Sequence, residues 1–294
     1  MNDIYRIDKV RMRASFDRAA EGYDAAAVLQ KEVRTRMLQR LDLVRITPEV
    51  ILDAGCGTGH ASYALSDRFP ESRVISLDIA LGMLRQTHAG QPGLKARLGR
   101  LAGLSPQNLL CGDIEQLPLA ADSTALVWSN LAIQWCNDLD LAFGEVNRVL
   151  QPDGLFMFST FGPDTLKELR QATAADAGHV HVSRFFDMHD IGDALVRAGF
   201  TAPVLDVEHF VLTYDDVQGV MRDLKAIGAR NAAQGRPRGL EGRGFLRQLT
   251  AAYEQFRLDG KLPATFEVVY GHAWKPQPKP AASGDIPITL HRRK

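Results

Sequence analysis

The sequence lacks several features that would each indicate a particular class of protein. Its three cysteines are an odd number without metal-ligand spacing, and its eight histidines show no such spacing either. No apolar run is long enough for a signal peptide or a transmembrane helix. The formal net charge of zero predicts no general attraction to polyanions. We therefore expect a soluble cytoplasmic protein without metal or membrane partner, in which Cys56, Cys111 and Cys136 are reduced and buried.

The most informative feature that is present is a glycine-rich turn after an apolar run. The run ends in Asp53, and glycines follow at positions 55, 57 and 59. A buried parallel strand delivers the chain to a ligand in this way. A dinucleotide-binding Gly-x-Gly-x-x-Gly would need a third glycine where His60 stands. The spacing instead resembles motif I of class I S-adenosylmethionine (SAM) methyltransferases, with an ordinary glycine-rich turn of another α/β fold as the alternative.

Three further predicted strands end at polar residues. Asp78 lies 25 residues after Asp53, where a carboxylate can accept both hydroxyls of a ribose. Asp113 is suitably placed for an adenine amino group, with Ile114 beside the ring, and Asn130 ends the next strand. One such acid is often only a helix N-cap, but the whole series favours a SAM site. The predicted cofactor-binding residues are Asp53, Gly55, Cys56, Gly57, Gly59, Asp78, Ile79, Met83, Asp113, Ile114, Asn130 and Leu131.

Strand and helix patterns alternate between residues 50 and 161, which predicts a parallel sheet with helices on both faces. The expected fold is α/β: a Rossmann-like class I methyltransferase fold with a seven-stranded, mostly parallel sheet. The predicted strands are 50–54, 73–78, 107–111, 125–130, 154–161, 203–212 and 266–274. The predicted helices are 9–22, 25–45, 163–175 and 187–198, and residues 91–106 read as a surface excursion.

The pattern also predicts how the chain is divided. Residues 1–45 form helices that close over the cofactor, and residues 46–275 form the SAM-binding domain. Within this domain, the insert 214–262 reads as mainly helical and precedes the last strand, so it would lie as a lid above the ligand edge. Residues 276–294 contain Pro, Gly and Ser with a basic end and are expected to form a mobile tail.

The chain resembles the malonyl-[acyl-carrier protein] O-methyltransferase family of biotin synthesis over nearly its whole length. The narrowest matching pieces are Phe-Gly-Pro-Asp-Thr-Leu at 161–166 and Leu-Lys-Ala-Ile-Gly-Ala at 224–229. Broader pieces cover residues 16–24, 52–59 and 130–135. The tail after Trp274 is longer than expected for the family core and receives no role.

This resemblance implies methyl transfer from SAM to the free carboxyl of a malonyl thioester, for the early pimeloyl stage of biotin synthesis. The acceptor would be malonyl-acyl-carrier protein or malonyl-CoA. A carboxylate is ionised at pH 7 and needs no general base, and the sequence shows no Ser-His-Asp set. A dry, well-aligned site favours the transfer. Two alternatives stay open: a SAM-dependent methyltransferase with another small acceptor, and a non-catalytic SAM-binding assembly factor.

Five side chains are candidates to orient the substrate. Tyr23 would close over SAM or touch the substrate carboxylate, or else would anchor an amphipathic helix. Gln134 and Trp135 follow the fourth strand, close to the expected methyl group, although Trp135 could be ordinary core. Arg184 would hold a carboxylate bidentately, with a solvated surface arginine as the alternative, and Phe185 follows it.

The insert carries a local excess of positive charge. Between residues 222 and 247 there are seven basic residues and two acids. Acyl-carrier proteins are acidic, so this excess predicts a docking face, unless it is only the solvated side of a helix. With few interleaved aromatics and no recognised binding module, no nucleic-acid partner is expected. The candidate partner-binding residues are Arg222, Lys225, Arg230, Arg236 and Arg243.

Overall fold

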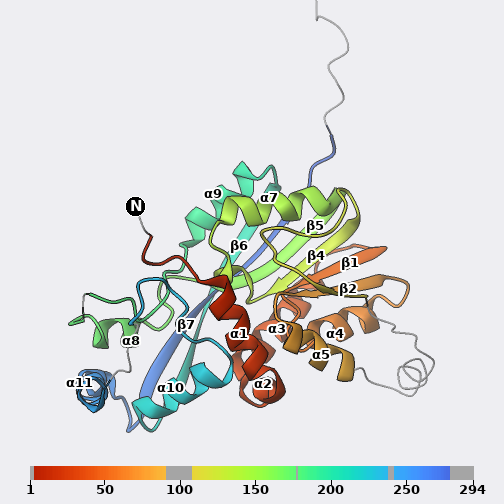
Figure 1. The fold of residues 1–294 in the computed structure, drawn as a ribbon. Helices are drawn as coiled ribbons and strands as arrows, with labels where there is room; N and C mark the ends of the chain where they lie inside the picture. The colour runs from red at the N-terminus through yellow and green to blue at the C-terminus, as the bar shows by residue number, and fades with distance from the viewer. Residues whose placement is uncertain (1–2, 91–107, 177, 238–241, 279–294) are drawn as a thin grey trace, which may run out of the picture.

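The computed structural model describes residues 3–90, 108–176, 178–237 and 242–278. A seven-stranded sheet with the order β3-β2-β1-β4-β5-β7-β6 runs through the centre of the molecule (Figure 1). β7 is antiparallel to both neighbours, and the other strand pairs are parallel. The predicted seven-stranded, mostly parallel sheet is confirmed. The strands are β1 (Val50–Ala54), β2 (Arg73–Asp78), β3 (Asn108–Cys111), β4 (Thr124–Asn130), β5 (Leu150–Phe161), β6 (Thr201–Tyr214) and β7 (Leu262–Trp274).

Helices cover both faces of the sheet because successive strand residues point to opposite sides. In β1, Ile51 packs into a core with α3 and α4, whereas the next residue, Leu52, packs into a second core with α7 and α9. Both side chains are completely buried. Figure 1 shows the two helical layers on either side of the sheet. The layers contain α3 (Val28–Leu41), α4 (His60–Arg68) and α5 (Leu81–Ala89) on one side, and α7 (Leu139–Val149) and α9 (Met188–Arg197) on the other.

The N-terminal segment is more broken than its sequence pattern suggests. The predicted helix 9–22 ends early in a 3-10 turn, and the predicted helix 25–45 ends at Leu41. Gly22 lies at the first break, and glycine inside a helix costs about 1 kcal/mol relative to alanine. The pieces before α3 are α1 (Lys9–Ala19), η1 (Ala20–Gly22) and α2 (Tyr23–Ala26).

The insert between β6 and β7 contains two helices, as expected, but residues 227–237 between them are irregular. There Ala233 forms an isolated antiparallel bridge with Ile7 of the N-terminal segment. The two segments are therefore joined above the carboxyl edge of the sheet, where α1 crosses in Figure 1. The insert comprises α10 (Val217–Ala226), α11 (Arg243–Tyr253) and η3 (Glu254–Phe256).

Some predictions require correction. The predicted helix 163–175 is reduced to α8 (Lys167–Ala172), because the preceding residues bind the edge of β7 instead. Cys56 and Cys136 are buried free thiols, but Cys111 is exposed, since β3 lies at the edge of the sheet.

Two expectations fall largely outside the part of the chain that the structure describes. These are the surface excursion at 91–106 and the mobile tail, of which only residues 276–278 are described. Within the described ranges, no helix is both long and apolar enough to cross a membrane.

Candidate active site

The turn between β1 and α4 forms the centre of the site. Gly55, Gly57 and Gly59 have φ values of +82°, +56° and +86°, which L-residues rarely adopt. A Cβ on Gly55 would lie 2.3 Å from the Ala132 Cβ, and one on Gly59 would lie 2.5 Å from the Thr87 Cγ2. A Cβ on Gly57 would meet no atom within 4 Å. Gly55 and Gly59 are therefore required by the packing of the protein, whereas Gly57 faces open space.

That open space belongs to a pocket at the carboxyl ends of β1, β2 and β4, here named the strand-end pocket. It brings together most of the side chains predicted to bind the cofactor, and α1 covers it with residues that sequence reasoning missed. Its lining includes Lys9, Met12 and Phe16 of α1, Tyr23, Gly55, Gly57, Asp78, Ile79, Met83, Asp113, Ile114, Asn130, Leu131 and Trp135.

Asp78 ends β2 inside this pocket. Its Oδ2 accepts a hydrogen bond from the Gly57 N–H at 2.9 Å, and its Oδ1 accepts one from the Ala80 N–H at 2.8 Å. Burial raises the pKa of Asp78 to about 6, although these backbone donors oppose the shift. The carboxylate can accept further hydrogen bonds, so it suits a ligand with neighbouring hydroxyl groups.

Asp53 lies deeper, at 1% exposure. Its Oδ2 accepts a hydrogen bond from the Ser62 hydroxyl at 2.5 Å, while its Oδ1 has no partner among the described residues. Burial raises the pKa of Asp53 to about 7, with the Ser62 bond opposing and the charge of Asp78 adding to the shift. An unpartnered buried carboxylate oxygen is costly, and a cationic ligand group would satisfy it.

Asp53 does not line the strand-end pocket but lines a second pocket beside it. The two pockets share Tyr23, Gly55, Gly57 and Asn130. Arg34 of α3 lines the second pocket as well, although no sequence motif points to this arginine. Burial lowers the pKa of Arg34, and the carboxylates of Asp24 and Asp53 oppose that shift. A guanidinium and a carboxylate in one pocket match the carboxylate and the ammonium of an amino-acid group. Cys56 lines the same pocket, whereas Gly59 lines neither.

Asp113 holds α1 across the strand-end pocket. The Lys9 Nζ lies 3.0 Å from the Asp113 Oδ1 and 2.5 Å from the Glu115 Oε2. Ile114 is buried beside this pair. The acid predicted to meet an adenine amino group is therefore oriented by a lysine of the N-terminal segment.

A larger cavity of about 430 Å³, here named the lateral cavity, lies beside η2 (Ile133–Trp135). Trp135 lines both this cavity and the strand-end pocket, and no other described residue does so. Its ring packs edge-on against that of Phe16, with 5.2 Å between centroids. The lining is mainly apolar and includes Gln134, Phe161, Thr165, Leu166, Leu169, Phe185, Met221, Leu224, Lys225, Arg230 and Phe266.

The structure gathers four of the five substrate-orienting candidates around these pockets. Tyr23 lines the strand-end pocket, Trp135 lies between the two, and Gln134 and Phe185 line the lateral cavity. Arg184 is exposed and borders a different surface hollow, so the structure does not bring it to the lateral cavity. The cations that line the lateral cavity come from the insert instead.

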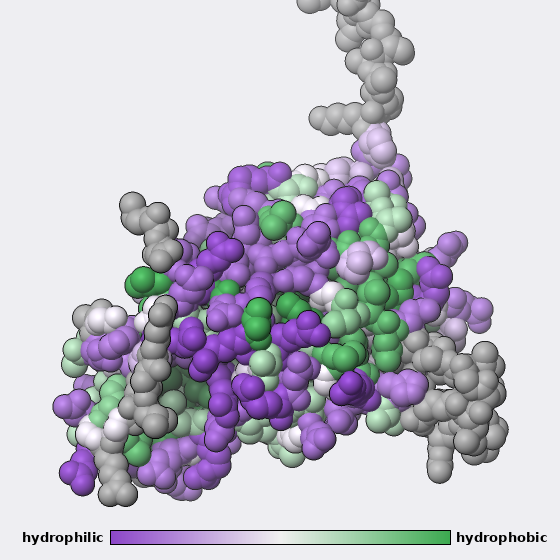
Figure 2. Space-filling view, viewed as in Figure 1, coloured by the Kyte–Doolittle hydropathy of each residue, from purple (hydrophilic) through white to green (hydrophobic). Residues whose placement is uncertain are grey.

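The basic residues of the insert differ in exposure. Arg222, Lys225 and Arg230 are exposed and have no ion-pair partner within the described ranges. Arg236 is partly buried and donates to the Ala233 carbonyl at 2.9 Å, and the side chain of Arg243 lies outside the described residues. In Figure 2 hydrophilic side chains cover most of the face that α1 and α10 present.

The strand-end pocket and the second pocket are lined by carboxylates, by basic side chains that include Lys9 and Arg34, and by apolar walls. Among the residues that the structure describes, no group of three or more His, Cys, Asp or Glu side chains is arranged to hold a metal ion.

Two solved structures with a similar fold are named as methyltransferases. A putative methyltransferase from Bacillus halodurans superposes with a TM-score of 0.58 at 17% identity, covering 83% of this chain and 99% of that one. Phosphoethanolamine N-methyltransferase 2 of Haemonchus contortus, solved with S-adenosyl-L-methionine, gives 0.54 at 15% identity, covering 89% of this chain and 57% of that one. Residues 52–158 match a family model described as a methyltransferase domain. The class I methyltransferase fold is thereby confirmed.

Sequence relatives identify the family more narrowly. A malonyl-[acyl-carrier protein] O-methyltransferase of Methylovorus sp. is 70% identical over 99% of this chain and 97% of its own length. Proteins of the same name from Laribacter hongkongensis and Gallionella capsiferriformans are 58% and 55% identical, each over 95% of this chain and 94% of their own lengths. Because these similarities extend over whole chains, this chain belongs to the malonyl-[acyl-carrier protein] O-methyltransferase family.

Proposed function

We propose that this chain transfers a methyl group from SAM to the free carboxylate of a malonyl group carried by acyl-carrier protein. The names of its relatives support both the reaction and the carrier. The observation that carries the proposal is the position of Trp135 between a pocket of carboxylates and an apolar cavity with cations in its lining. Such a residue lies where a cofactor and an acceptor can meet.

The polar groups of the strand-end pocket and of the second pocket, which share four lining residues, fit SAM. Asp78 would accept hydrogen bonds from the ribose hydroxyls. Asp113 would accept one from the adenine amino group, with Ile114 beside the ring. The unpartnered Oδ1 of Asp53 would accept a hydrogen bond from the ammonium of the methionine part, and Arg34 would bind its carboxylate. The apolar side chains Ile79, Met83 and Leu131 would pack against the rest of the molecule.

When bound, SAM supplies an electrophilic methyl group: a carboxylate oxygen forms the new C–O bond as the C–S bond breaks, the electron pair stays on sulfur, and no proton is transferred. The protein therefore needs to align and to exclude water rather than to act as a base. Trp135 and Tyr23 would shield the methyl group from solvent. Gln134 is held in place by a hydrogen bond from its Nε2 to the Leu131 carbonyl at 2.7 Å and would border the acceptor.

The insert would receive the carrier protein. Lys225 and Arg230 line the lateral cavity and are exposed, so they would attract the anionic acceptor, while Arg222 would contact the acidic carrier surface. Malonyl-CoA remains the second acceptor candidate. Residues 1–45 would close over the cofactor as one part, with 46–275 as the catalytic domain, and the protein would act in the cytoplasm.

The test is incubation of the purified chain with methyl-labelled SAM and either malonyl-carrier protein, malonyl-CoA or free malonate, followed by mass spectrometry. The expected product is a methyl ester of malonyl-carrier protein. If SAM raises the melting temperature but none of the three acceptors gains a methyl group, the proposed acceptor is wrong. A different small acceptor or a non-catalytic role would then be favoured.

A further inference from the structure

The edge of β7 is covered in an unusual way next to the lateral cavity. Beyond the end of β5, residues 162–168 take over the edge of β7, and we name this segment the edge cap. The Gly162 N–H donates to the Glu267 carbonyl at 2.9 Å. The Leu166 N–H donates to the Thr265 carbonyl at 2.7 Å. The backbone of the edge cap therefore forms hydrogen bonds with β7 that a neighbouring strand would otherwise form.

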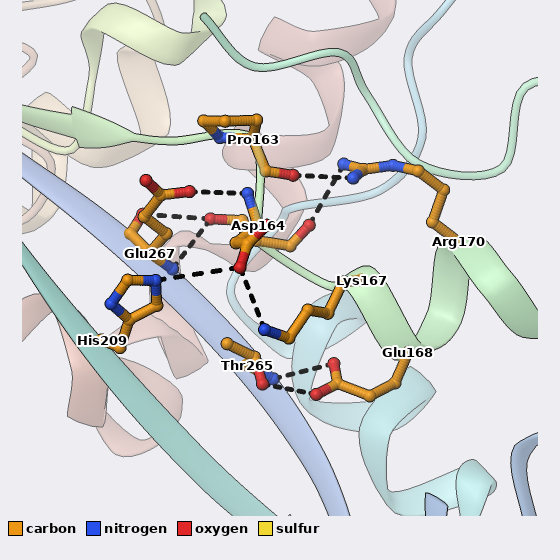
Figure 3. Close-up of polar contacts among 9 residues, drawn as sticks. Pro163, Asp164, Lys167, Glu168, Arg170, His209, Thr265 and Glu267 are labelled. Carbon is orange, nitrogen blue, oxygen red and sulfur yellow. Dashed lines mark hydrogen bonds and ion pairs between the residues drawn. The ribbon is translucent and has the colours of Figure 1, made fainter. Parts of the chain in front are cut away.

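Side chains of the edge cap complete this pairing. The Thr265 N–H donates to the Glu168 Oε2 at 3.0 Å, and the Glu267 N–H donates to the Thr165 Oγ1 at 3.1 Å. Figure 3 shows Glu168 pointing at Thr265 from α8. These backbone N–H groups of β7 are thus satisfied without a neighbouring strand.

The edge cap is fixed at further points. A Cβ on Gly162 would lie 2.5 Å from the Glu267 Cδ, so the two segments are in close contact. The Asp164 N–H donates to the Glu267 Oε2 at 2.6 Å. Arg170 donates to the Pro163 carbonyl at 2.7 Å, as Figure 3 also shows. The edge cap contains most of the Phe-Gly-Pro-Asp-Thr-Leu piece at 161–166, and these contacts hold its backbone in one position.

Leu166, in the middle of the edge cap, has a left-handed backbone with φ of +55°. Among the described non-glycine residues with positive φ, three are aspartates and one is alanine, and the other two are Leu131 and Leu166. Aspartate tolerates this region, whereas leucine rarely enters it. Leu131 lines the strand-end pocket and Leu166 lines the lateral cavity. Such backbone strain is concentrated at ligand sites.

We propose that Leu166 determines the length of the acyl group that the lateral cavity accepts. This inference depends on the proposed function, because it takes the cavity as the acceptor site. Leu166 is 8% exposed and Leu169 and Phe266 are 4% exposed each, so together they form the buried floor of the cavity. Lys225 and Trp135 line the same cavity as this floor, so an acyl group that reaches from one to the other would lie in the space that the floor bounds. Since the edge cap fixes the Leu166 backbone, the floor cannot recede for a longer chain.

The experiment compares malonyl-carrier protein with succinyl-carrier protein, which has one more methylene, in the wild type and in Leu166→Gly. Glycine suits the left-handed backbone and removes the side chain from the floor. One methylene of pocket space changes discrimination by about 10-fold or more. The ratio of kcat/KM for succinyl to that for malonyl should therefore rise about tenfold, while the Kd for SAM stays unchanged. Asp153→Gly is the matched control, because Asp153 has φ of +61° and lines neither pocket.

The outcomes separate the two proposals. A wild-type chain that methylates neither acceptor overturns the proposed function. A wild-type chain that methylates malonyl-carrier protein, with an unchanged ratio in Leu166→Gly, overturns only the role of Leu166. If Leu166→Gly does not fold, Leu166→Asn decides in the same way, since asparagine tolerates the left-handed region and is shorter than leucine.

Discussion

At the scale of single residues, the site depends on two carboxylates that are held out of water. Asp53 and Asp78 both end strands, and burial raises the pKa of the first to about 7 and of the second to about 6. Burial disfavours the charged form of both carboxylates, so such a site selects a ligand that donates hydrogen bonds or carries positive charge. SAM carries positive charge on both its sulfonium and its ammonium.

The affinity for SAM should therefore depend on pH. Because SAM prefers the ionised carboxylates, its affinity should rise as pH increases through 6 and 7 and should level off above about pH 8. Binding at pH 7 should release protons, which calorimetry in buffers of different ionisation enthalpy would detect. Asp53→Asn should remove the part of the dependence near pH 7. An affinity that is flat from pH 5.5 to 8 would contradict the assignment of both carboxylates.

Asp78 gives a second prediction at this scale. Asp78→Ala should lose two charge-assisted hydrogen bonds to the ribose, each worth about 1.5–3 kcal/mol before compensation. The affinity for SAM should fall at least about tenfold, as measured by calorimetry. Wild-type affinity in this variant would show that the ribose binds elsewhere.

At the scale of elements, the turn between β1 and α4 contains glycines of two kinds. Gly55 and Gly59 are required for packing within the protein, whereas Gly57 faces the open space of the pocket. Gly57→Val should fold, with a cost of about 1–2 kcal/mol for the left-handed backbone, but should not bind SAM. Gly55→Ala should instead lower the melting temperature strongly, because its Cβ would lie 2.3 Å from the Ala132 Cβ. Thermal unfolding and calorimetry on both variants distinguish the two effects. Retained SAM binding by Gly57→Val would mean that the turn does not face the ligand.

The mostly parallel sheet and the carboxylates at its strand ends could be predicted from the sequence. Parallel strands place their carboxyl ends at one edge, so Asp53, Asp78 and Asp113 had to lie near one another wherever the helices packed. Local pattern was sufficient for this part of the site. The shortness of α8 depends on how residues 162–168 bind β7, and no local sequence pattern contains that contact.

The helices show why the remaining site residues could not be predicted. Arg34, Arg36 and Arg40 are alike in the sequence of α3, but of the three only Arg34 lines one of the pockets described above. The Arg36 Nη1 lies 2.9 Å from the Glu208 Oε1, and the Arg40 Nη2 lies 2.6 Å from the Asp206 Oδ2. The packing of the buried side of α3 decides which arginine faces the pocket, and that rotation of the helix is a tertiary property. Lys9 could not be predicted for the same reason, because the packing of α1 brings its side chain to the strand-end pocket.

At the scale of the whole molecule, one cover spans both pockets. The N-terminal segment closes the strand-end pocket, and the insert borders the lateral cavity. They meet where Gly228, with φ of +71°, leaves room for the Phe16 ring, since a Cβ there would lie 2.9 Å from its Cδ1. Phe16 in turn packs on Trp135. The conformation of the cover is thereby linked to the place where the two pockets adjoin.

The outer side of this cover gives the last prediction, which concerns the carrier protein. Arg222 and Arg247 are exposed and lie outside the lateral cavity, so Arg222→Glu with Arg247→Glu changes the surface charge without changing the site. Electrostatic steering changes association rates about 10-fold or more, so KM for malonyl-carrier protein should rise about tenfold. The kcat should change little. Arg73→Glu, at an exposed residue at the amino end of β2, is the matched control and should have no effect.

Salt and a small acceptor complete this test. Exposed charges are screened over about 10 Å at 0.1 M ionic strength, so added salt should raise KM of the wild type towards that of the double variant. Malonyl-CoA presents no protein surface, and its KM should respond less to the charge reversal, although its phosphates can use part of the same face. If KM for malonyl-carrier protein changes neither with the charge reversal nor with added salt, the insert does not bind the carrier protein. Its basic residues would then be only the solvated sides of α10 and α11.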